Sequence, residues 1–353
     1  MGIKENRQSG RIIYLDITRI LATLAVMLIH ISGQNYYKVD VSSSEWGVMN
    51  FCDGISRWAV AAFVMISGAL FLRRTITIER IFRKNVLRIA TAFLFWSAVY
   101  AVVGYDPDQG VKGLILDLAK GHYHMWFLYL IAGLYMIVPF MRRIAEDRVL
   151  TDYFIMLGVL FTFILPSGIQ IISLFRPGYA AHLREITELL DMRFVVGYPV
   201  YYIMGYWLSS RTFSRRAKQL ILVTGLTGFV MTVMLTAWTS QRNGSASEMF
   251  YDYLTLNVML ESVLVFAGAR KLMEGRALSP KAEKIILKLS KWSFGAFLVH
   301  PLFLKILRKG VHLNSLTFHP AVTIPLMLLL VAFLSFSVSA IIHRIPFLNK
   351  YIV

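Results

Sequence analysis

The stretch of sequence that decides the fold is IIYLDITRILATLAVMLIHISG, residues 12–33. This apolar run reaches the roughly 20 residues that a helix needs to cross a membrane, although it contains Asp16, Arg19 and His30. Basic residues precede it, as they precede the apolar part of a signal peptide. However, Asp16 and Arg19 would interrupt that apolar part, and no small-x-small cleavage site follows. We therefore interpret residues 12–33 as a retained first transmembrane helix.

The composition of the whole chain agrees with a membrane protein. Of its 353 residues, 57% are hydrophobic and only 16% are charged, and the mean hydropathy is +0.59. Soluble domains contain about 25% charged residues, so these values argue against a soluble globular enzyme. The single cysteine, Cys52, can form neither an internal disulfide nor a Cys-based metal site, and it does not report the redox compartment.

Further apolar segments follow the first along the whole chain. They are continuous rather than alternating, which favours helices over membrane strands. No loop is large enough for a soluble domain, although residues 170–193 could hold a short interfacial helix. We therefore predict one domain, residues 1–353, folded as an all-α integral membrane bundle. Its ten or so transmembrane helices are expected at residues 12–33, 51–72, 86–104, 125–140, 153–172, 194–209, 219–239, 251–269, 292–309 and 320–342.

The basic residues are distributed unevenly between the two sides of this predicted bundle. The chain has 37 Lys and Arg against 20 Asp and Glu, a net charge of +17. With ten spans, one set of alternate loops holds 25 of these cations and the other set holds 10, while Arg19 and Arg57 lie inside spans. Because cytoplasmic loops are enriched in Lys and Arg, both termini should be cytoplasmic. The excess charge is thereby explained without a nucleic-acid partner, and we predict none.

Two ionisable residues of the first helix point to function. Charged groups inside a membrane are expensive and mark functional sites by default. Arg19 and His30 are eleven residues apart, which on a helix is within about 20° of three full turns and about 16 Å along the axis. The two side chains therefore share one face. The alternative is that Arg19 extends to the inner interface, paired with Asp16, while His30 packs. For the aligned pair we favour a functional role.

A second candidate pair lies near the outer start of the second span. Asp53 and Arg57 are spaced i, i+4, and the hairpin between the first two helices brings them near the depth of His30. A carboxylate and a guanidinium there could orient the histidine and tune its chemistry. The alternative is a structural ion pair of little energetic value.

Four further polar or aromatic residues are weaker candidates for contacting a substrate. His124 and Trp126 mark the outer start of the fourth helix, where Trp126 also fits an interfacial aromatic belt. Glu261 and His300 lie near the middle of the eighth and ninth helices. A buried histidine often only packs, and a glutamic acid can stay neutral beside a hydrogen-bond partner. The histidines are too dispersed to suggest a metal site, and none is predicted.

Several segments, in order along the chain, carry a resemblance to a known family. They are R-ILATLAVMLI-H (residues 19–30) after Y-L-D-I-T-R, AAFVMISGALFL (61–72), IFRKNVLRIATAFLFW (81–96), HMWFLYLIAGLYMIVPFM (124–141) and SFGAFLVHPLFL (293–304). Together they resemble the acyltransferase-3 family of integral-membrane acyltransferases. Within it, the chain looks most similar to stand-alone O-acetyltransferases of surface polysaccharides. Because the sequence shows no C-terminal hydrolase domain of the kind that some relatives carry, a relay through a soluble partner stays open.

The resemblance implies an enzyme of the bacterial cytoplasmic (inner) membrane with several spans. The expected donor is cytosolic acyl-CoA, usually acetyl-CoA, and the expected acceptor is a carbohydrate hydroxyl. His30 would act as general base or take the acyl group as an acyl-imidazole. Arg19, positioned by Asp16, would contact the donor. The phosphates of coenzyme A would be held by inner-face cations, for which we name Arg83, Lys84 and Arg88.

Other functions remain open at this point. A secondary transporter or flippase for a lipid-linked sugar would explain ten spans, with Asp16, Glu261 and His300 as a proton path. It does not predict the alignment of Arg19 with His30. A membrane sensor without chemistry explains the buried polar residues poorly. The sequence leaves open the acceptor sugar, the acyl group and whether the protein forms a homo-oligomer in its membrane lipid.

Overall fold

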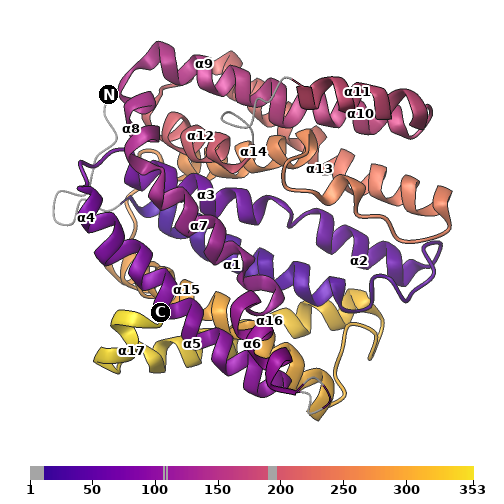
Figure 1. The fold of residues 1–353 in the computed structure, drawn as a ribbon, viewed down its shortest axis with the longest axis vertical. Helices are drawn as coiled ribbons and strands as arrows, with labels where there is room; N and C mark the ends of the chain where they lie inside the picture. The colour runs from indigo at the N-terminus through magenta and orange to yellow at the C-terminus, as the bar shows by residue number, and fades with distance from the viewer. Residues whose placement is uncertain (1–11, 106–107, 109, 190–196) are drawn as a thin grey trace.

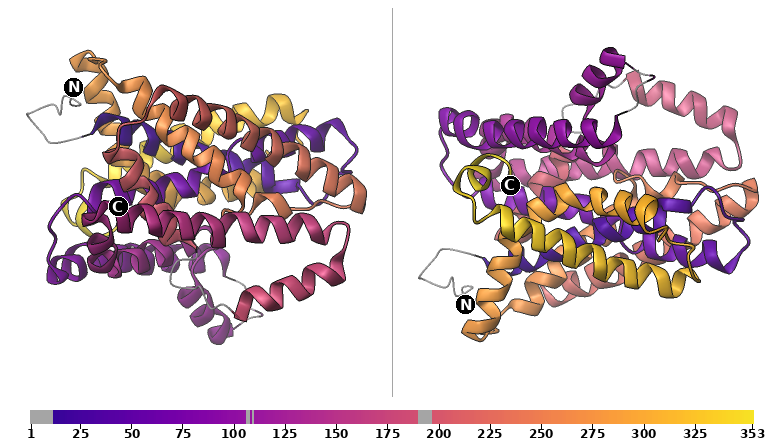
Figure 2. Two further views of the ribbon diagram at one scale, coloured as in Figure 1. Left: turned by 90° about the horizontal axis from the view of Figure 1, so that it is seen from above. Right: turned by 90° about the horizontal axis from the view of Figure 1, so that it is seen from below.

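The structure is a computed structural model that describes residues 12–105, 108, 110–189 and 197–353 (Figure 1). Within these residues it consists of helices joined by short loops and contains no strand. The long helices lie side by side with their axes roughly parallel, as the views of Figure 2 also show. The predicted all-α membrane bundle is confirmed for this part of the chain.

Within the described residues, each of the ten predicted spans falls on helical structure, while residues 194–196 of the sixth predicted span lie outside the described residues. The N-terminal half contains α1 (Ile13–Ser32), α2 (Ser44–Gly54), α3 (Trp58–Phe71), α5 (Leu87–Gly104), α7 (Trp126–Met136) and α8 (Val138–Glu146). The C-terminal half contains α9 (Arg148–Gly158) with α10 (Leu165–Ser173), α12 (Tyr198–Ser210), α13 (Arg215–Asn243), α14 (Leu256–Met273), α15 (Pro280–Gly310) and α16 (Pro320–Ile342).

Not all of these helices are equally suited to span a membrane. Among the described residues, seven helical stretches are long and apolar enough to cross, or eight if α6 and α7 together with α8, bent by 57°, count as one span. The short α12 and the more polar α15 complete the ten predicted segments. The chain is therefore a multi-pass membrane protein, while the number of crossings and the side of the termini stay predictions.

Short helices fill the remaining segments. A short helix, α11 (Pro177–Leu189), lies within residues 170–193, where the sequence suggested a short interfacial helix. Its position at the membrane interface stays a prediction, and residues 190–193 lie outside the described residues. Residues 105–124, which lie between the third and fourth predicted spans, contain α6 (Gly110–Lys120), followed by the short helix η4 (Tyr123–Met125). The basic segment before α5 is formed by α4 (Ile78–Arg80) and the π-helical η2 (Ile81–Val86), and α17 (Pro346–Tyr351) lies near the end of the chain.

Helix α1 is central to the bundle, because it packs against α3, α14, α15 and α16. Its small residues Ala22 and Ala25 are buried in these contacts. The hydroxyls of Thr18, Thr23 and Ser32 each donate to the carbonyl oxygen four residues earlier, so each has a hydrogen-bond acceptor within its own helix. Arg19 and His30 thus lie on a helix that packs against four other helices of the bundle.

Helices α3 and α12 approach so closely that only glycine fits at two positions. A Cβ atom on Gly68 would overlap the carbonyl oxygen of Tyr202, and one on Gly205 would overlap the backbone of Met65. Small residues of this kind let membrane helices pack backbone to backbone. The contact fixes α3, which follows directly after the turn that carries Asp53 and Arg57.

We expect Gly68→Ala and Gly205→Ala each to lower the stability of the folded protein by about 1–3 kcal/mol or more, because overpacking forces two backbones apart. The measurement is thermal unfolding in detergent, followed by the monodisperse fraction in gel filtration. Gly268→Ala in α14 is the matched control, since a Cβ there meets no atom within 4 Å. Equal melting temperatures for all three variants would contradict the assigned role of this contact.

Candidate functional site

His30, near the C-terminal end of α1, contacts His300 of α15. The Nδ1 atom of His30 lies 2.7 Å from Nε2 of His300. The two rings are parallel to within 4°, and their centroids are 5.0 Å apart. Since the nitrogen–nitrogen distance is much shorter than the centroid distance, the rings meet edge to edge through an in-plane hydrogen bond. His300 is fully buried, whereas His30 is half-buried and lines a cavity.

The proline after His300 explains how this pair is held. Pro301 has no N–H, so it cannot donate to the carbonyl oxygen of Phe297 one helical turn earlier. That carbonyl instead lies 2.6 Å from Nδ1 of His300. Because a carbonyl only accepts, Nδ1 of His300 carries a hydrogen, and Nε2 of the neutral ring accepts from Nδ1–H of His30. The network therefore assigns the lone pair of neutral His30 to its Nε2 atom.

Two more histidines lie beside this pair. His124 of η4 is buried, with its ring centroid 5.5 Å from that of His300, and its Nε2 lies 3.3 Å from the carbonyl oxygen of Leu298. Nδ1 of His124 lies 3.0 Å from Nδ1 of His122. The hydroxyl of Tyr100 also donates to the Leu298 carbonyl. These contacts tie the loop before α7 to α15 next to His30.

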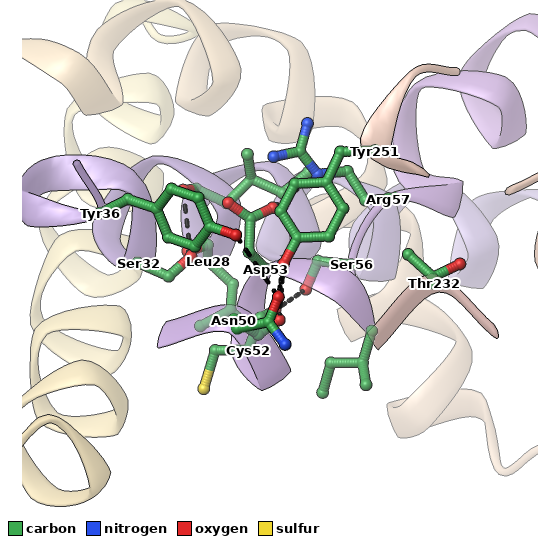
Figure 3. Close-up of polar contacts among 12 residues, drawn as sticks. Leu28, Ser32, Tyr36, Asn50, Cys52, Asp53, Ser56, Arg57, Thr232 and Tyr251 are labelled. Carbon is green, nitrogen blue, oxygen red and sulfur yellow. Dashed lines mark hydrogen bonds and ion pairs between the residues drawn. The ribbon is translucent and has the colours of Figure 1, made fainter. Parts of the chain in front are cut away.

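Asp53 and Arg57 form a buried ion pair at the turn between α2 and α3. Arg57 Nε lies 2.6 Å from Oδ1 of Asp53, and the two residues are 7% and 1% exposed. The guanidinium also lies 4.0 Å from the ring centroid of Tyr251. Figure 3 shows the Tyr251 hydroxyl directed at Asn50, whose Oδ1 accepts from it at 2.6 Å. Removing either partner of such a buried pair is strongly destabilising, because it leaves the other charge buried and unpaired.

His30 and this ion pair open into one cavity of about 720 Å³, which we call the His30 cavity. Its walls come from the end of α1, the α2–α3 turn, the segment before η4, the loop between α13 and α14, and the end of α15. The chemically active lining residues are His30, Asp53, Arg57, His122, Tyr123, Glu248, Tyr253, Lys305, Arg308 and Lys309. Segments from several predicted outer loops therefore meet here, and the His30 and Asp53–Arg57 candidates are brought together.

Glu248, which lines this cavity, accepts a hydrogen bond from a tyrosine of the segment after α1. Burial raises the pKa of Tyr37 well above its ordinary value, and a hydrogen bond to Glu248 together with the charge of that carboxylate adds to the rise. Tyr37 therefore stays protonated at neutral pH and donates to Glu248.

Arg19 lies near the opposite end of α1, in a polar cluster shared with α15. The hydroxyl of Ser290 donates to the carboxylate of Asp16. Nη1 of Arg19 donates to the same hydroxyl at 3.2 Å and lies 3.6 Å from Oδ1 of Asp16. The expected pairing of Asp16 with Arg19 is thus present, with Ser290 bridging them. The carboxylate is buried, whereas 27% of the Arg19 side chain is exposed.

A second cavity, of about 450 Å³, opens at Arg19, and we call it the Arg19 cavity. It is strongly basic, since its cations are Arg19, Arg74, Arg80 and Lys84 and its only acidic lining residue in the described chain is Asp16. Of the cations named from the sequence, Arg19 and Lys84 are here. The other two point elsewhere, because Arg83 pairs with Glu79 at the surface and Arg88 donates to the carbonyl of Val353.

Trp126 and Glu261 do not line either of these cavities. The Trp126 ring stacks on Tyr253, a lining residue of the His30 cavity, with centroids 5.8 Å apart. Glu261 is fully buried between α13 and α14, where the hydroxyl of Thr232 contacts its Oε1 atom. Trp126 is thus one layer behind the cavity, while Glu261 belongs to a helix contact.

A metal centre is not indicated among the described residues, where no three His, Cys, Asp or Glu side chains converge in a way that could hold an ion. The sequence-based expectation of no metal stays a prediction. The clustered histidines instead form pairs through their own ring nitrogens and backbone carbonyls.

Several site residues were not found from the sequence. Glu248 and Tyr253 lie in a loop with no recognisable motif, and Arg74 and Arg80 are indistinguishable from other topology-setting cations. One signal in the sequence could have pointed to the site. Lys305, Arg308 and Lys309 form a basic group on the side of the membrane where the positive-inside rule predicts few Lys and Arg residues.

Comparison with known families gives one match that covers nearly the whole chain. Residues 12–344 match the acyltransferase-3 family model, described as an acyltransferase domain. No curated protein and no solved structure matches the chain.

Proposed function

The chain belongs to the acyltransferase-3 family, and from this premise we propose that it moves an acetyl or other short acyl group from cytosolic acyl-CoA to a hydroxyl of a cell-surface polysaccharide or its lipid-linked precursor. One observation carries the proposal. Arg19 and His30 share a face of α1 but open into two separate cavities, one near each end of the helix. A donor held at one end and an acceptor held at the other would meet along α1.

The donor is assigned to the Arg19 cavity. Coenzyme A carries several phosphate groups, and Arg and Lys side chains bind phosphates through charge-assisted hydrogen bonds. The four cations of this cavity, with Asp16 already engaged by Ser290, supply such donors. In this proposal the phosphates lie at the predicted cytoplasmic end, and the pantetheine arm follows α1 over the roughly 16 Å that separates Arg19 from His30.

The acceptor is assigned to the His30 cavity. Nε2 of His30 takes the proton of the acceptor hydroxyl while the oxygen attacks the thioester carbonyl carbon. The carbon–sulfur bond then breaks, and the thiolate of coenzyme A receives that proton from the imidazolium. The products are an O-acyl sugar and free coenzyme A. Asp53 and Arg57, which line the same cavity, orient the acceptor, and His300 holds the His30 ring.

The direct test is acyl transfer in purified membranes. Radiolabelled acetyl-CoA is supplied with polysaccharide extracted from a strain that lacks this chain. The proposal predicts labelled, alkali-labile polysaccharide and release of free coenzyme A that depends on the acceptor. The proposal is overturned if no label enters carbohydrate and if the membranes release no more coenzyme A than membranes without the protein.

We expect Arg19→Gln to raise the KM for acyl-CoA about tenfold, because the free energy of one charge-assisted hydrogen bond corresponds to about that factor in affinity. The KM for the acceptor should stay within twofold, because Arg19 lies at the other end of α1. Arg143→Gln is the matched control, since that side chain is 85% exposed and lines neither cavity. An unchanged acyl-CoA KM in a normally folded Arg19→Gln protein would remove the donor assignment.

The transporter alternative required a proton path through Asp16, Glu261 and His300. The structure places the three in different surroundings, at the Arg19 cavity, in the α13–α14 contact and against His30. Nothing in this arrangement favours transport. The bacterial inner membrane as location, and a carbohydrate as partner, belong to the proposal.

A further inference from the structure

The end of α15 carries a group of cations that the reaction described above does not use. Lys305, Arg308 and Lys309 follow an i, i+3, i+4 pattern, which places them on one helix face, and all three line the His30 cavity. We call them the α15 cation group. In the described part of the chain, none of them forms an ion pair with a carboxylate. Lys305 Nζ donates to the carbonyl of Val103 at 2.7 Å, which leaves its charge uncompensated.

The acidic residues of the same cavity are already engaged. Asp53 is paired with Arg57, and Glu248 accepts a hydrogen bond from Tyr37. The lining therefore has four cations, Arg57 and the α15 cation group, against two carboxylates. The cavity that contains His30 is electropositive.

Two general effects do not account for this group. Cations in the last turn of a helix are favoured by its dipole, and Arg308 and Lys309 are in such a turn. Lys120, in the last turn of α6, has the same benefit without lining the His30 cavity. The charge rule for membrane proteins works in the opposite direction, because it depletes Lys and Arg on the side to which these residues are assigned. Three cations around one cavity require another explanation.

The position of the group relative to His30 restricts what it can bind. Lys305 and Lys309 follow His300 by five and nine residues, which is about 7–14 Å along α15. His300 is in contact with His30. An anion held by the α15 cation group therefore lies within the same cavity as the reacting hydroxyl.

We propose that the acceptor is anionic and that the α15 cation group binds its oxyanion. This inference rests on the proposed function, because it takes the His30 cavity to be the acceptor site. The shared chemistry is a carboxylate or phosphate oxygen accepting from Arg308 and Lys309. Two sources supply it, the carboxylate of an acidic sugar and the pyrophosphate of a lipid-linked saccharide precursor.

The test measures binding alone, with the full-length protein in nanodiscs of uncharged phosphatidylcholine. Calorimetry compares two probe pairs: a glucuronic acid tetrasaccharide with its carboxyl-reduced form, and an isoprenyl pyrophosphate with the corresponding alcohol. We expect one charged probe to bind at least about tenfold more tightly than its neutral counterpart. The double variant Arg308→Gln/Lys309→Gln should lose this preference, and the matched control Lys120→Gln should keep it. Raising the salt concentration should weaken only the charged probe.

The outcomes separate this inference from the proposed function. The inference is overturned if neither charged probe binds more tightly than its neutral counterpart, if no charged probe binds, or if the double variant keeps the preference at an unchanged melting temperature. A preference without any acyl transfer in membranes would remove the proposed function and leave the binding site. Acyl transfer to a neutral polysaccharide, with no preference for either charged probe, would remove the inference and leave the proposed function.

Discussion

Membranes that contain His30→Ala should transfer acetyl groups about 10²–10⁴ times more slowly than membranes with the unchanged protein, the range for loss of a positioned general base. Nε2 of His30 carries the lone pair in the hydrogen-bond network, and His30 lines the cavity assigned to the acceptor. Without it, the attacking hydroxyl has no group to take its proton. The measurement is label incorporated from acetyl-CoA at equal protein level, determined by immunoblot.

A matched control separates loss of this histidine from loss of any histidine. His182 of α11 pairs with Glu185, its side chain is 76% exposed, and it lines neither cavity. His182→Ala should therefore transfer at the normal rate. Full acetylation by His30→Ala at an unchanged protein level would show that the catalytic assignment is wrong.

The same assay, run without acceptor, distinguishes a base from an acyl carrier. If His30 acts as a base, wild-type protein releases no coenzyme A and carries no label until polysaccharide is added. If His30 accepts the acyl group, one equivalent of coenzyme A is released at once and label stays on the protein. In that case His30→Ala should carry no label. Both results keep His30 at the reacting centre but assign it different chemistry.

The fold was largely predictable because apolar helices in a membrane leave a strong local signal. Residues 12–33 were predicted to be helical, and α1 covers Ile13–Ser32. The break inside the second predicted span was not foreseen, although Asp53, Gly54, Ser56 and Arg57 interrupt its apolar run there. There the Ser56 hydroxyl donates to the carbonyl of Cys52, and the Trp58 indole N–H donates to that of Ile55. Such local bonds leave no periodic pattern in a sequence.

The candidate site was predictable only where one helix contains it. Arg19 and His30 could be aligned because helical geometry fixes residues of the same helix relative to each other. Ser290 and His300 contact them from α15, some 270 positions later in the chain. A single sequence does not specify which face of α15 meets α1. For the same reason, Arg74 could not be distinguished from surface cations, whereas the structure places it in the Arg19 cavity.

The partner of His30 should matter through the tautomer it imposes. His300 accepts from Nδ1–H of His30, and it can do so only while its own Nδ1–H is held by the Phe297 carbonyl. Pro301 frees that carbonyl, because it has no N–H to donate. Without the acceptor on His300, neutral His30 can move its proton to Nε2, and the nitrogen needed as base is then blocked. His300 is in this view a positioning residue.

We therefore expect His300→Leu to lower kcat about 10–100-fold, the size measured for outer partners that fix the tautomer of a metal-bound histidine. The acyl-CoA KM should change little, since the Arg19 cavity is distant. His300→Gln should recover most of the rate, because its amide oxygen can accept from Nδ1–H of His30. Pro301→Ala should lower kcat by a smaller factor, since its new N–H competes for the Phe297 carbonyl.

¹⁵N chemical shifts of labelled His30 report the tautomer directly. If His300→Gln is as slow as His300→Leu while both fold normally, or if the His30 tautomer is the same in His300→Leu as in the unchanged protein, His300 supports the fold rather than the reaction.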